Sequence, residues 1–275
     1  MKKRDRIYTL ILVVVLIAGL SLLLYPSFSD WWNSRIQTKL ISHYNDVIST
    51  MNEEDYSAFW EGARAHNESL LSRSNPYLLT DEQRESYWAQ LDPGGDGVMG
   101  YVEVPSIGVT FPIYHGTDEL VLQVAIGHLE WTSLPVGGES THSVISGHRG
   151  LPSAKLFTDL DKLVVGDYFM LHILGETLTY EVDQIRIVLP QETDDLLIQE
   201  GKDLCTMFTC TPYGINSHRL LVRGHRVENL AEAQTVRVTA DAVIVEKLVV
   251  APFVLVPILL VMLVWMLIDS RKRKK

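Results

Sequence analysis

Cysteine is nearly absent from this chain, with two residues among 275. Cys205 and Cys210 are five positions apart in a run that we expect to be a β-strand. Their side chains should therefore point to opposite faces and lie about 16 Å apart. A disulfide needs Cα atoms within about 7 Å of each other. The sequence excludes a disulfide framework, and both thiols should stay reduced.

Basic residues are also in the minority, with 24 lysines and arginines against 34 aspartates and glutamates and a net charge of −10. Residues 1–6 sum to +3 and residues 269–275 to +4, which leaves −17 for the segment between them. Phosphate binding needs a basic face, so we expect no nucleic acid partner. An acidic segment would instead favour the approach of cationic groups such as a lysine amine.

Charge is missing altogether from two long runs, the 19 residues Ile7–Tyr25 and the 21 residues Leu248–Ile268. At about 1.5 Å per residue, each run is long enough to span a bilayer core as a helix, and each adjoins a basic cluster. A buried core helix is the alternative for both runs, and a signal peptide is the alternative for the first. No small-x-small cleavage site follows Tyr25, which favours an uncleaved anchor. We expect a membrane-anchored protein with both termini in the cytoplasm and residues from about 30 to 245 outside.

The hydrophobic period changes near residue 97. Over residues 31–90 apolar side chains recur at helical spacing, with an interruption at Ser74-Asn75-Pro76-Tyr77 and Thr80 as a candidate N-cap for the last helix. From Val98 onward short runs of period two predict strands, and Gly175-Glu176 is predicted to be the tight turn of a hairpin. Many short strands in about 130 residues predict a mainly β fold, either a barrel or a sandwich.

Cys210 ends an apolar run directly before a turn, whereas Cys205 lies inside the run. We expect Cys205 in the core and Cys210 as a reactive thiol. A catalytic cysteine needs an acid or base that the fold brings close to it. Among nine histidines, His148 follows a short strand and a glycine and so also emerges at a strand end. Three others are expected to be surface or structural residues: His43, His66 and His172.

Several motifs lie around these two residues and upstream of them. They are Ser146-Gly147-His148-Arg149-Gly150 with Phe157-Thr158-Asp159-Leu160, Thr209-Cys210-Thr211-Pro212-Tyr213-Gly214, His218-Arg219-Leu220-Leu221-Val222-Arg223-Gly224, Gly127-His128-Leu129-Glu130, Ser133-Leu134-Pro135-Val136-Gly137-Gly138 and Ile113-Tyr114-His115-Gly116-Thr117. Together these motifs resemble the sortases, and the similarity is greatest to the class C, pilus-assembling sortases of Gram-positive bacteria. The resemblance covers roughly residues 97–227, and a C-terminal membrane helix is also typical of the class. It implies a closed β-barrel of about eight strands with short helices.

The resemblance also implies the chemistry. Cys210 resembles the nucleophile that attacks the Thr-Gly carbonyl of an LPXTG sorting signal and forms a thioacyl enzyme. His148 resembles the acid that protonates the departing glycine amine and later takes a proton from the incoming nucleophile. Arg219 resembles the arginine that holds the substrate backbone or the oxyanion. Three other arginines are alternatives for that role: Arg149, Arg223 and Arg226. No cofactor and no metal ion is implied.

Class C sortases usually carry an N-terminal lid whose Asp-Pro-aromatic motif plugs the active site. This chain has Asn75-Pro76-Tyr77 in the expected region, and Tyr77 could cover the thiol. Asn75 departs from the usual acid, because it can hydrogen-bond an arginine but cannot form a charged pair. We therefore expect a more weakly latched lid. An ordinary turn between two helices is the alternative.

The resemblance implies a transpeptidase that polymerises pilins, with a pilin lysine amine resolving the thioacyl intermediate. Its partners would be pilin subunits that carry sorting signals and acceptor lysines, and the lipid bilayer. Three alternatives stay open: a housekeeping sortase that attaches proteins to cell-wall precursor, a non-catalytic pilus scaffold or chaperone on a sortase fold, and a cysteine protease of another fold. The expected segments are a cytoplasmic tail 1–6, a membrane anchor 7–25, a helical arm with the lid 26–96, the catalytic barrel 97–230, a linker 231–247, a membrane helix 248–268 and a basic cytoplasmic tail 269–275.

Overall fold

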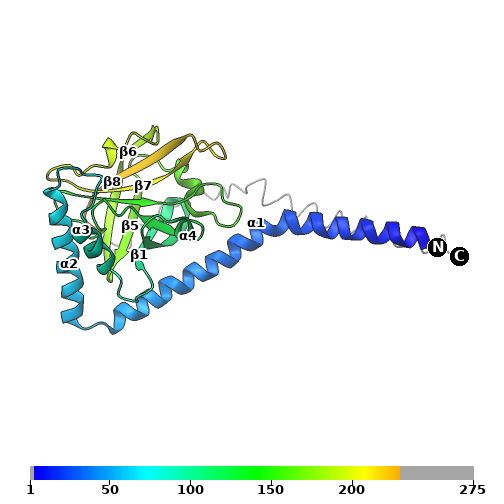
Figure 1. Cartoon of the computed structure of the whole chain (residues 1–275), viewed down its shortest axis with the longest axis horizontal. Coiled ribbons are helices and arrows are strands. Elements are labelled where there is room, and N and C mark those ends of the chain that lie inside the picture. The colour runs from blue at the N-terminus through cyan, green and yellow to red at the C-terminus, as the bar shows by residue number, and fades with distance from the viewer. Residues whose placement is uncertain (1–2, 230–275) are drawn as a thin grey trace. The chain divides into compact units, whose positions relative to one another are not determined.

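The structure is a computed structural model, and it describes residues 3–229 (Figure 1). The expected linker, C-terminal membrane helix and basic tail therefore lie outside the described residues. The helices are α1 (Lys3–Thr50), α2 (Glu53–Leu71), α3 (Asp81–Ala89) and α4 (Glu119–Leu122), with 3-10 turns η1 (Pro105–Ile107), η2 (Leu156–Lys162) and η3 (Asp194–Leu196). The strands are β1 (Val98–Val104), β2 (Val109–His115), β3 (Ile126–His128), β4 (Thr141–Ser146), β5 (Tyr168–Ile173), β6 (Glu176–Val188), β7 (Asp203–Thr211) and β8 (His218–Arg226).

The eight strands form a closed barrel in the order β1-β2-β3-β4-β7-β8-β6-β5. Strands β2 and β3 pair in parallel, as do β4 and β7, and the remaining neighbours are antiparallel. The mainly β fold and the closed barrel are thus confirmed, and the sandwich is excluded. Full closure leaves no unpaired sheet edge, which protects a β protein against edge-to-edge association.

Alternation along each strand fills the barrel with apolar side chains. Val102, Ile113, Ile145, Met207 and Val222 are fully buried and belong to one core cluster. Five different strands supply these residues, so closing the barrel removes all of them from water together.

Two details of the strand prediction are corrected by the structure. The hairpin between β5 and β6 turns at Leu174 and Gly175, because Glu176 already pairs with Ile173. Both turn residues have positive φ, 47° and 79°, which is the backbone of a type I′ turn. The second detail is β3, which the sequence did not predict. A strand of three residues is too short to show an alternating pattern.

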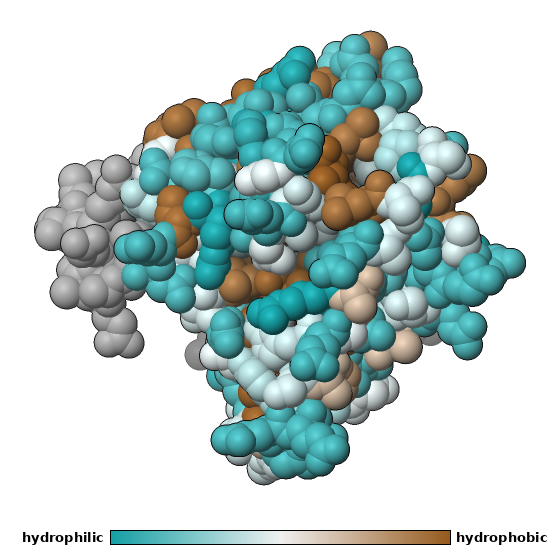
Figure 2. Space-filling model, turned by 90° about the vertical axis from the view of Figure 1, so that its left-hand side faces the viewer, coloured by the Kyte–Doolittle hydropathy of each residue, from teal (hydrophilic) through white to brown (hydrophobic). Residues whose placement is uncertain are grey.

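The helical arm packs against the barrel. In α2, the buried face consists of Trp60, Ala63, His66, Asn67 and Leu70. Asn67 joins the arm to the barrel through both backbone groups of Leu134: its amide donates to the carbonyl at 3.1 Å and its oxygen accepts from the N–H at 2.7 Å. Most of the molecular face that carries α2 is hydrophilic, with separate apolar patches (Figure 2).

The last helix of the arm begins where the sequence predicts. Thr80 caps α3 in a capping box: its hydroxyl accepts from the N–H of Gln83, and the Gln83 side chain accepts from the N–H of Thr80, each at 3.1 Å.

Helix α1 contains the first apolar run and continues into the arm. It is the one helix among residues 3–229 that is long and apolar enough to cross a membrane, and none of its most apolar window is buried. The first apolar run therefore does not form a buried core helix. The chain divides into two compact units, with a boundary after Trp31. In the second unit, α1 packs on the barrel, where the Tyr44 hydroxyl donates to the carbonyl of Met99 at 2.9 Å and accepts from the N–H of Leu174 at 2.7 Å.

Candidate active site

The parallel pairing of β4 and β7 aligns the chain before His148 with the chain before Cys210. The strand register ends with Ser146 opposite Phe208. Two further hydrogen bonds extend it by one residue: the Gly147 N–H donates to the Phe208 carbonyl at 3.2 Å, and the Thr209 hydroxyl donates to the Gly147 carbonyl at 2.7 Å. One residue further along each chain are His148, which lies just past the end of β4, and Cys210, which lies in β7.

The antiparallel pairing of β7 and β8 brings in the arginine. Cys210 and Arg219 are direct cross-strand partners. Residues opposite each other in this way share a face, with Cβ atoms about 5 Å apart. The Arg219 guanidinium donates to the carbonyls of Asn216 and His218 at 3.3 and 3.1 Å. In the described part of the chain no carboxylate forms an ion pair with it, so its positive charge is not neutralised there.

The three alternative arginines have other partners. Arg223 binds both carboxylate oxygens of Asp183, at 2.9 and 3.0 Å. Arg149 donates to the Thr211 hydroxyl at 3.2 Å and forms an ion pair with Asp161. The guanidinium of Arg226 lies 5.8 Å from the centre of the Tyr180 ring, at the other end of β8. Arg219 is therefore the arginine whose geometry suits a role at Cys210.

The two cysteines lie on opposite faces of β7, as strand alternation predicts. Cys205 is fully buried in the barrel core, and burial raises the pKa of its thiol well above the usual value. Cys210 is only partly buried. Its face of the barrel carries a second, smaller apolar cluster: Val144, Val188, Leu196 and Leu221, with Leu129, Trp131 and Phe208 against it. A partly exposed thiol next to an apolar cluster, with an arginine opposite it on the neighbouring strand, is suited to nucleophilic chemistry.

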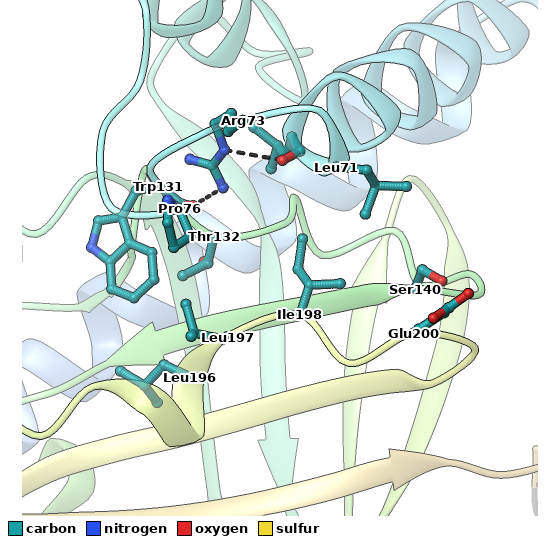
Figure 3. A pocket seen from close by; sticks show the side chains of 11 residues that line it. Leu71, Arg73, Pro76, Trp131, Thr132, Ser140, Leu196, Leu197, Ile198 and Glu200 are labelled. Carbon is teal, nitrogen blue, oxygen red and sulfur yellow. Dashed lines mark hydrogen bonds between the residues drawn. The ribbon is translucent and has the colours of Figure 1, made fainter.

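A pocket of about 540 Å³ lies near this cluster (Figure 3). Its walls come from the end of α2 and the following turn, from Trp131 and Thr132, and from the β6–β7 loop at Leu196–Ile198. In Figure 3 the guanidinium of Arg73 lies across the pocket from the β6–β7 loop, and it donates to the carbonyls of Leu70 and Trp131 at 3.2 and 2.9 Å. Cys210, His148 and Arg219 do not line the pocket, so it flanks the thiol site and does not contain it.

The predicted lid segment lies at the edge of this pocket. Pro76 lines it, and the Tyr77 ring meets the Trp131 ring edge-on with centroids 5.3 Å apart. The Tyr77 hydroxyl donates to Asp194 at 3.2 Å, so the segment touches the β6–β7 loop. Asn75 accepts from the backbone N–H of Tyr77 at 3.0 Å. Among residues 3–229 there is no hydrogen bond between Asn75 and Arg219, and Tyr77 has no hydrogen bond or ring contact to Cys210.

Sequence reasoning missed His142. Its Nδ1–H donates to the Leu197 carbonyl at 2.9 Å, and its Nε2 accepts from the Thr206 hydroxyl at 2.8 Å, which ties the β6–β7 loop to β7. Burial lowers the pKa of His142 to about 4, so the imidazole is neutral near pH 7. Its position in β4, six residues before His148, was the signal available, but nothing local indicated the two partners.

Two histidines that were expected to be structural have structural contacts. His66 is hydrogen-bonded to Ser86, and burial lowers its pKa to about 4. His172 contacts Glu103 at 3.1 Å and stacks on Tyr101.

Comparison with known proteins agrees with this fold. Residues 102–227 match the sortase domain family. Sortase D of Bacillus subtilis strain 168 is 29% identical over 151 residues, which covers 54% of this chain and 72% of the relative. The crystal structure of sortase C1 from Streptococcus agalactiae is 52% identical with a TM-score of 0.68, covering 70% of this chain and all of the other. Sortase C of Clostridium perfringens, solved with its C-terminal cell wall sorting motif, is 44% identical with a TM-score of 0.62, over 70% of this chain and all of the other.

The fold and the comparisons define a thiol-dependent transpeptidase on a closed β-barrel. The chain belongs to the sortase family, and its structural matches are to class C sortases. It is thus a cysteine transpeptidase that acts on sorting-signal substrates. This conclusion sets aside both the non-catalytic scaffold and the protease of another fold.

Proposed function

We propose that this chain is a membrane-anchored pilin polymerase. It would cleave an LPXTG-like sorting signal between Thr and Gly and transfer the acyl group to a lysine amine of another pilin. The observation that supports the proposal is the strand register, which pairs Cys210 with Arg219 and brings Gly147, the residue before His148, into contact with β7. The pilin substrate is supported by similarity to sortase C1 of the GBS Pilus Island 1, which is 40% identical with a TM-score of 0.63.

In the acylation step, the Cys210 thiolate attacks the threonine carbonyl carbon, a C–S bond forms, and an electron pair moves onto the oxygen. The guanidinium of Arg219 stabilises that oxyanion, since a fixed cation with N–H donors suits a charge that develops in the transition state. When the intermediate collapses, the Thr–Gly C–N bond breaks. His148, as imidazolium, donates its proton to the departing glycine nitrogen. The products are a thioacyl enzyme and a peptide with a free amine.

In the transfer step, the neutral amine of a pilin lysine attacks the thioacyl carbon. His148, now a neutral imidazole, takes a proton from the attacking nitrogen, and the C–S bond breaks to release the thiolate. An isopeptide bond has formed, and thiolate and imidazolium are both restored. The acidic segment between the two basic termini, with a net charge of −17, would favour approach of the lysine-bearing partner.

We also propose that Asn75-Pro76-Tyr77 acts as a lid. The support is its contact with Trp131, which packs against the apolar cluster beneath the thiol, and with Asp194 of the β6–β7 loop. The contact that would hold this lid closed differs from the expected contact between Asn75 and an arginine. The Tyr77 hydroxyl makes it by donating to Asp194, and Asn75 stabilises the turn. When closed, such a lid competes with substrate, so the apparent affinity falls with the fraction of closed molecules.

For the membrane we propose two spanning helices, residues 7–25 and 248–268, with both tails cytoplasmic and the barrel outside. The support is the basic cluster beside each apolar run and the length and exposure of α1. The proposed domain division is the one predicted from the sequence, with the arm at 26–96, the catalytic barrel at 97–230 and the linker at 231–247.

One experiment tests the function and separates it from the housekeeping alternative. The full chain in detergent is incubated with a sorting-signal peptide and either a pilin fragment with an accessible lysine or a cell-wall precursor amine, and products are identified by mass. An isopeptide product with the lysine donor, absent with Cys210→Ala, is the expected result. Product with the cell-wall amine alone would contradict pilin polymerisation and support the housekeeping function.

A further inference from the structure

We infer that Arg149 is a positioning residue that fixes the separation of His148 and Cys210. The inference rests on the proposed function, because it takes these two residues as the reacting pair. Arg149 directly follows His148, and Thr211 directly follows Cys210. The Arg149 guanidinium donates to the Thr211 hydroxyl at 3.2 Å, so one hydrogen bond joins the residues next to the acid and the nucleophile.

The sheet itself does not hold His148. Strand β4 ends at Ser146, and the last ladder-like bonds to β7 are made by Gly147. Beyond Gly147 the chain that carries His148 leaves the sheet, whereas β7 continues to Thr211 and pairs there with β8. The Arg149–Thr211 bond is the next hydrogen bond between the two segments. One residue after Arg149, Gly150 lies against the Tyr213 ring. A Cβ atom at Gly150 would come within 2.8 Å of a ring atom of Tyr213. Gly150 also has a φ of 76°, which favours glycine. The segments after His148 and Cys210 therefore run side by side.

A second contact fixes the direction of the guanidinium. Its Nη2 forms an ion pair with Asp161 at the end of η2, and the Arg149 side chain is only 10% exposed. The other acid of this turn, Asp159, is already paired with Lys155 and Lys162 at 2.7 and 2.8 Å. Because Asp161 is partly exposed, its pairing adds little stability by itself, but it prevents the guanidinium from rotating away from Thr211.

Two hydrogen bonds attach η2 to the segment that carries His148. The Phe157 N–H donates to the His148 carbonyl at 3.1 Å, and the Gly150 N–H donates to the Thr158 hydroxyl at 3.1 Å. Residues 148–161 thus form a closed loop, and Arg149 is its hydrogen-bonded connection to the end of β7. Removing that connection lets the imidazole move relative to the thiol without opening the barrel.

The expected consequence is kinetic. Neither Arg149 nor Thr211 lines the pocket beside the site, whereas proton transfer and thiolate formation depend on the distance from imidazole to sulfur. Loss of the Arg149–Thr211 bond should therefore lower kcat by about tenfold and change KM by less than about twofold. The rate at which iodoacetamide alkylates Cys210 should change too, because the reactivity of the thiol depends on where the imidazole lies.

The test uses the full chain with isosteric variants of Thr211. Thr211→Val removes the hydroxyl and keeps the shape, and Thr211→Ser keeps the hydroxyl. Arg149→Met removes the donor, and the double variant Arg149→Met/Thr211→Val completes a cycle. Arg223→Met is the matched control, since Arg223 is also paired with an aspartate and its side chain is 12% exposed. The measurements are kcat and KM with a sorting-signal peptide and a lysine donor, and the rate of iodoacetamide alkylation of Cys210 against pH.

We expect Thr211→Val and Arg149→Met to lower kcat to the same extent, the double variant to be no worse, and Thr211→Ser and Arg223→Met to stay close to the original protein. A Thr211→Val enzyme with unchanged kcat and an unchanged alkylation profile would overturn the inference, as would additive losses in the double variant. If Arg149→Met does not fold, the comparison of Thr211→Val with Thr211→Ser tests the inference. If the original protein makes no product, the proposed function fails, and the alkylation profile still tests the positioning role.

Discussion

Cys210 and Arg219 face each other directly across β7 and β8, on a face of the barrel where Arg219 has only backbone carbonyls as hydrogen-bond acceptors among the described residues. Carbonyl partners hold the guanidinium in place but leave its charge uncompensated. An oxyanion that forms at the substrate carbonyl can therefore meet a cation that needs no rearrangement. Cys210 and Arg219 can each be tested by a substitution with a matched control in the same strand.

The first prediction concerns the nucleophile. Cys210→Ala should abolish sorting-signal cleavage and any thioacyl adduct detectable by mass spectrometry. Cys205→Ala should retain most of the activity and lose about 1 kcal/mol of stability, because it only shortens a buried side chain. Equal loss of activity in both variants, with both still folded by circular dichroism, would contradict the assignment.

The second prediction concerns the arginine. Arg219→Ala should lower kcat/KM by about 10² to 10³, as expected for removal of an oxyanion donor, and Arg219→Lys should recover part of it. Arg223→Ala serves as the control, because Arg223 is held by Asp183 four residues further along β8. Steady-state kinetics with a sorting-signal peptide measure both. A larger effect at Arg223 than at Arg219 would exchange their roles.

The third prediction tests the lid. Tyr77→Phe removes the hydrogen bond to Asp194 and keeps the contact with Trp131, whereas Tyr77→Ala removes both. Since a neutral-to-charged hydrogen bond contributes about 1.5 kcal/mol, Tyr77→Phe should speed thiol labelling of Cys210 several-fold, and Tyr77→Ala should speed it further. Asp194→Ala should match Tyr77→Phe and add nothing to it. Unchanged labelling rates in all three variants would mean that Asn75-Pro76-Tyr77 is an ordinary turn.

The fourth prediction concerns pH. Burial lowers the pKa of His142 from 6.5 to about 4, so the folded protein binds this proton less readily than the unfolded chain does. The stability that neutral His142 contributes is thus fully present above pH 6.5 and is lost as the pH falls toward 4. Its upper limit is about 3 kcal/mol, at about 1.36 kcal/mol per pKa unit.

Urea titrations between pH 7 and 4 measure this dependence. His142→Gln, which keeps a side-chain donor and acceptor but does not titrate, should be less stable at pH 7 and should have a flatter pH dependence. Burial also lowers the pKa values of His66 and His128, to about 4 and about 3, so part of the slope should remain in this variant. An identical slope in the variant and the original protein would show that His142 titrates normally.

The fifth prediction concerns topology. A protease added to intact cells after removal of the wall should digest the segment between residues 30 and 245 and spare both tails, because both basic clusters should remain inside. Tags at the two termini, detected by blotting, report the outcome. A C-terminal tag that is lost from intact cells would contradict two crossings.

Local sequence was sufficient where a structural property depends on neighbours along the chain. Alternation in a strand decides that Cys205 and Cys210 face opposite ways, and a cap followed by a glutamine decides where α3 begins. The same local rules failed at β3, which is too short to show a period, and at the β5–β6 turn, where the predicted position was one residue too late. They carried no information on Leu197 and Thr206, which flank His142 in space and are more than 50 residues from it in the chain.

The sequence by itself predicted a mainly β fold from its periodicity. Its motifs of adjacent residues, through their resemblance to sortases, pointed to a closed barrel and to the candidate residues of the thiol site. Among four arginines near these motifs the resemblance pointed to Arg219, and the tertiary structure shows what each of the four contacts. Asp183 pairs with Arg223, Thr211 and Asp161 hold Arg149, and Tyr180 lies beneath Arg226, which leaves Arg219 opposite the thiol. Such pairings depend on strand register across the closed barrel, which joins segments distant in the chain and which a single sequence does not encode in any local pattern.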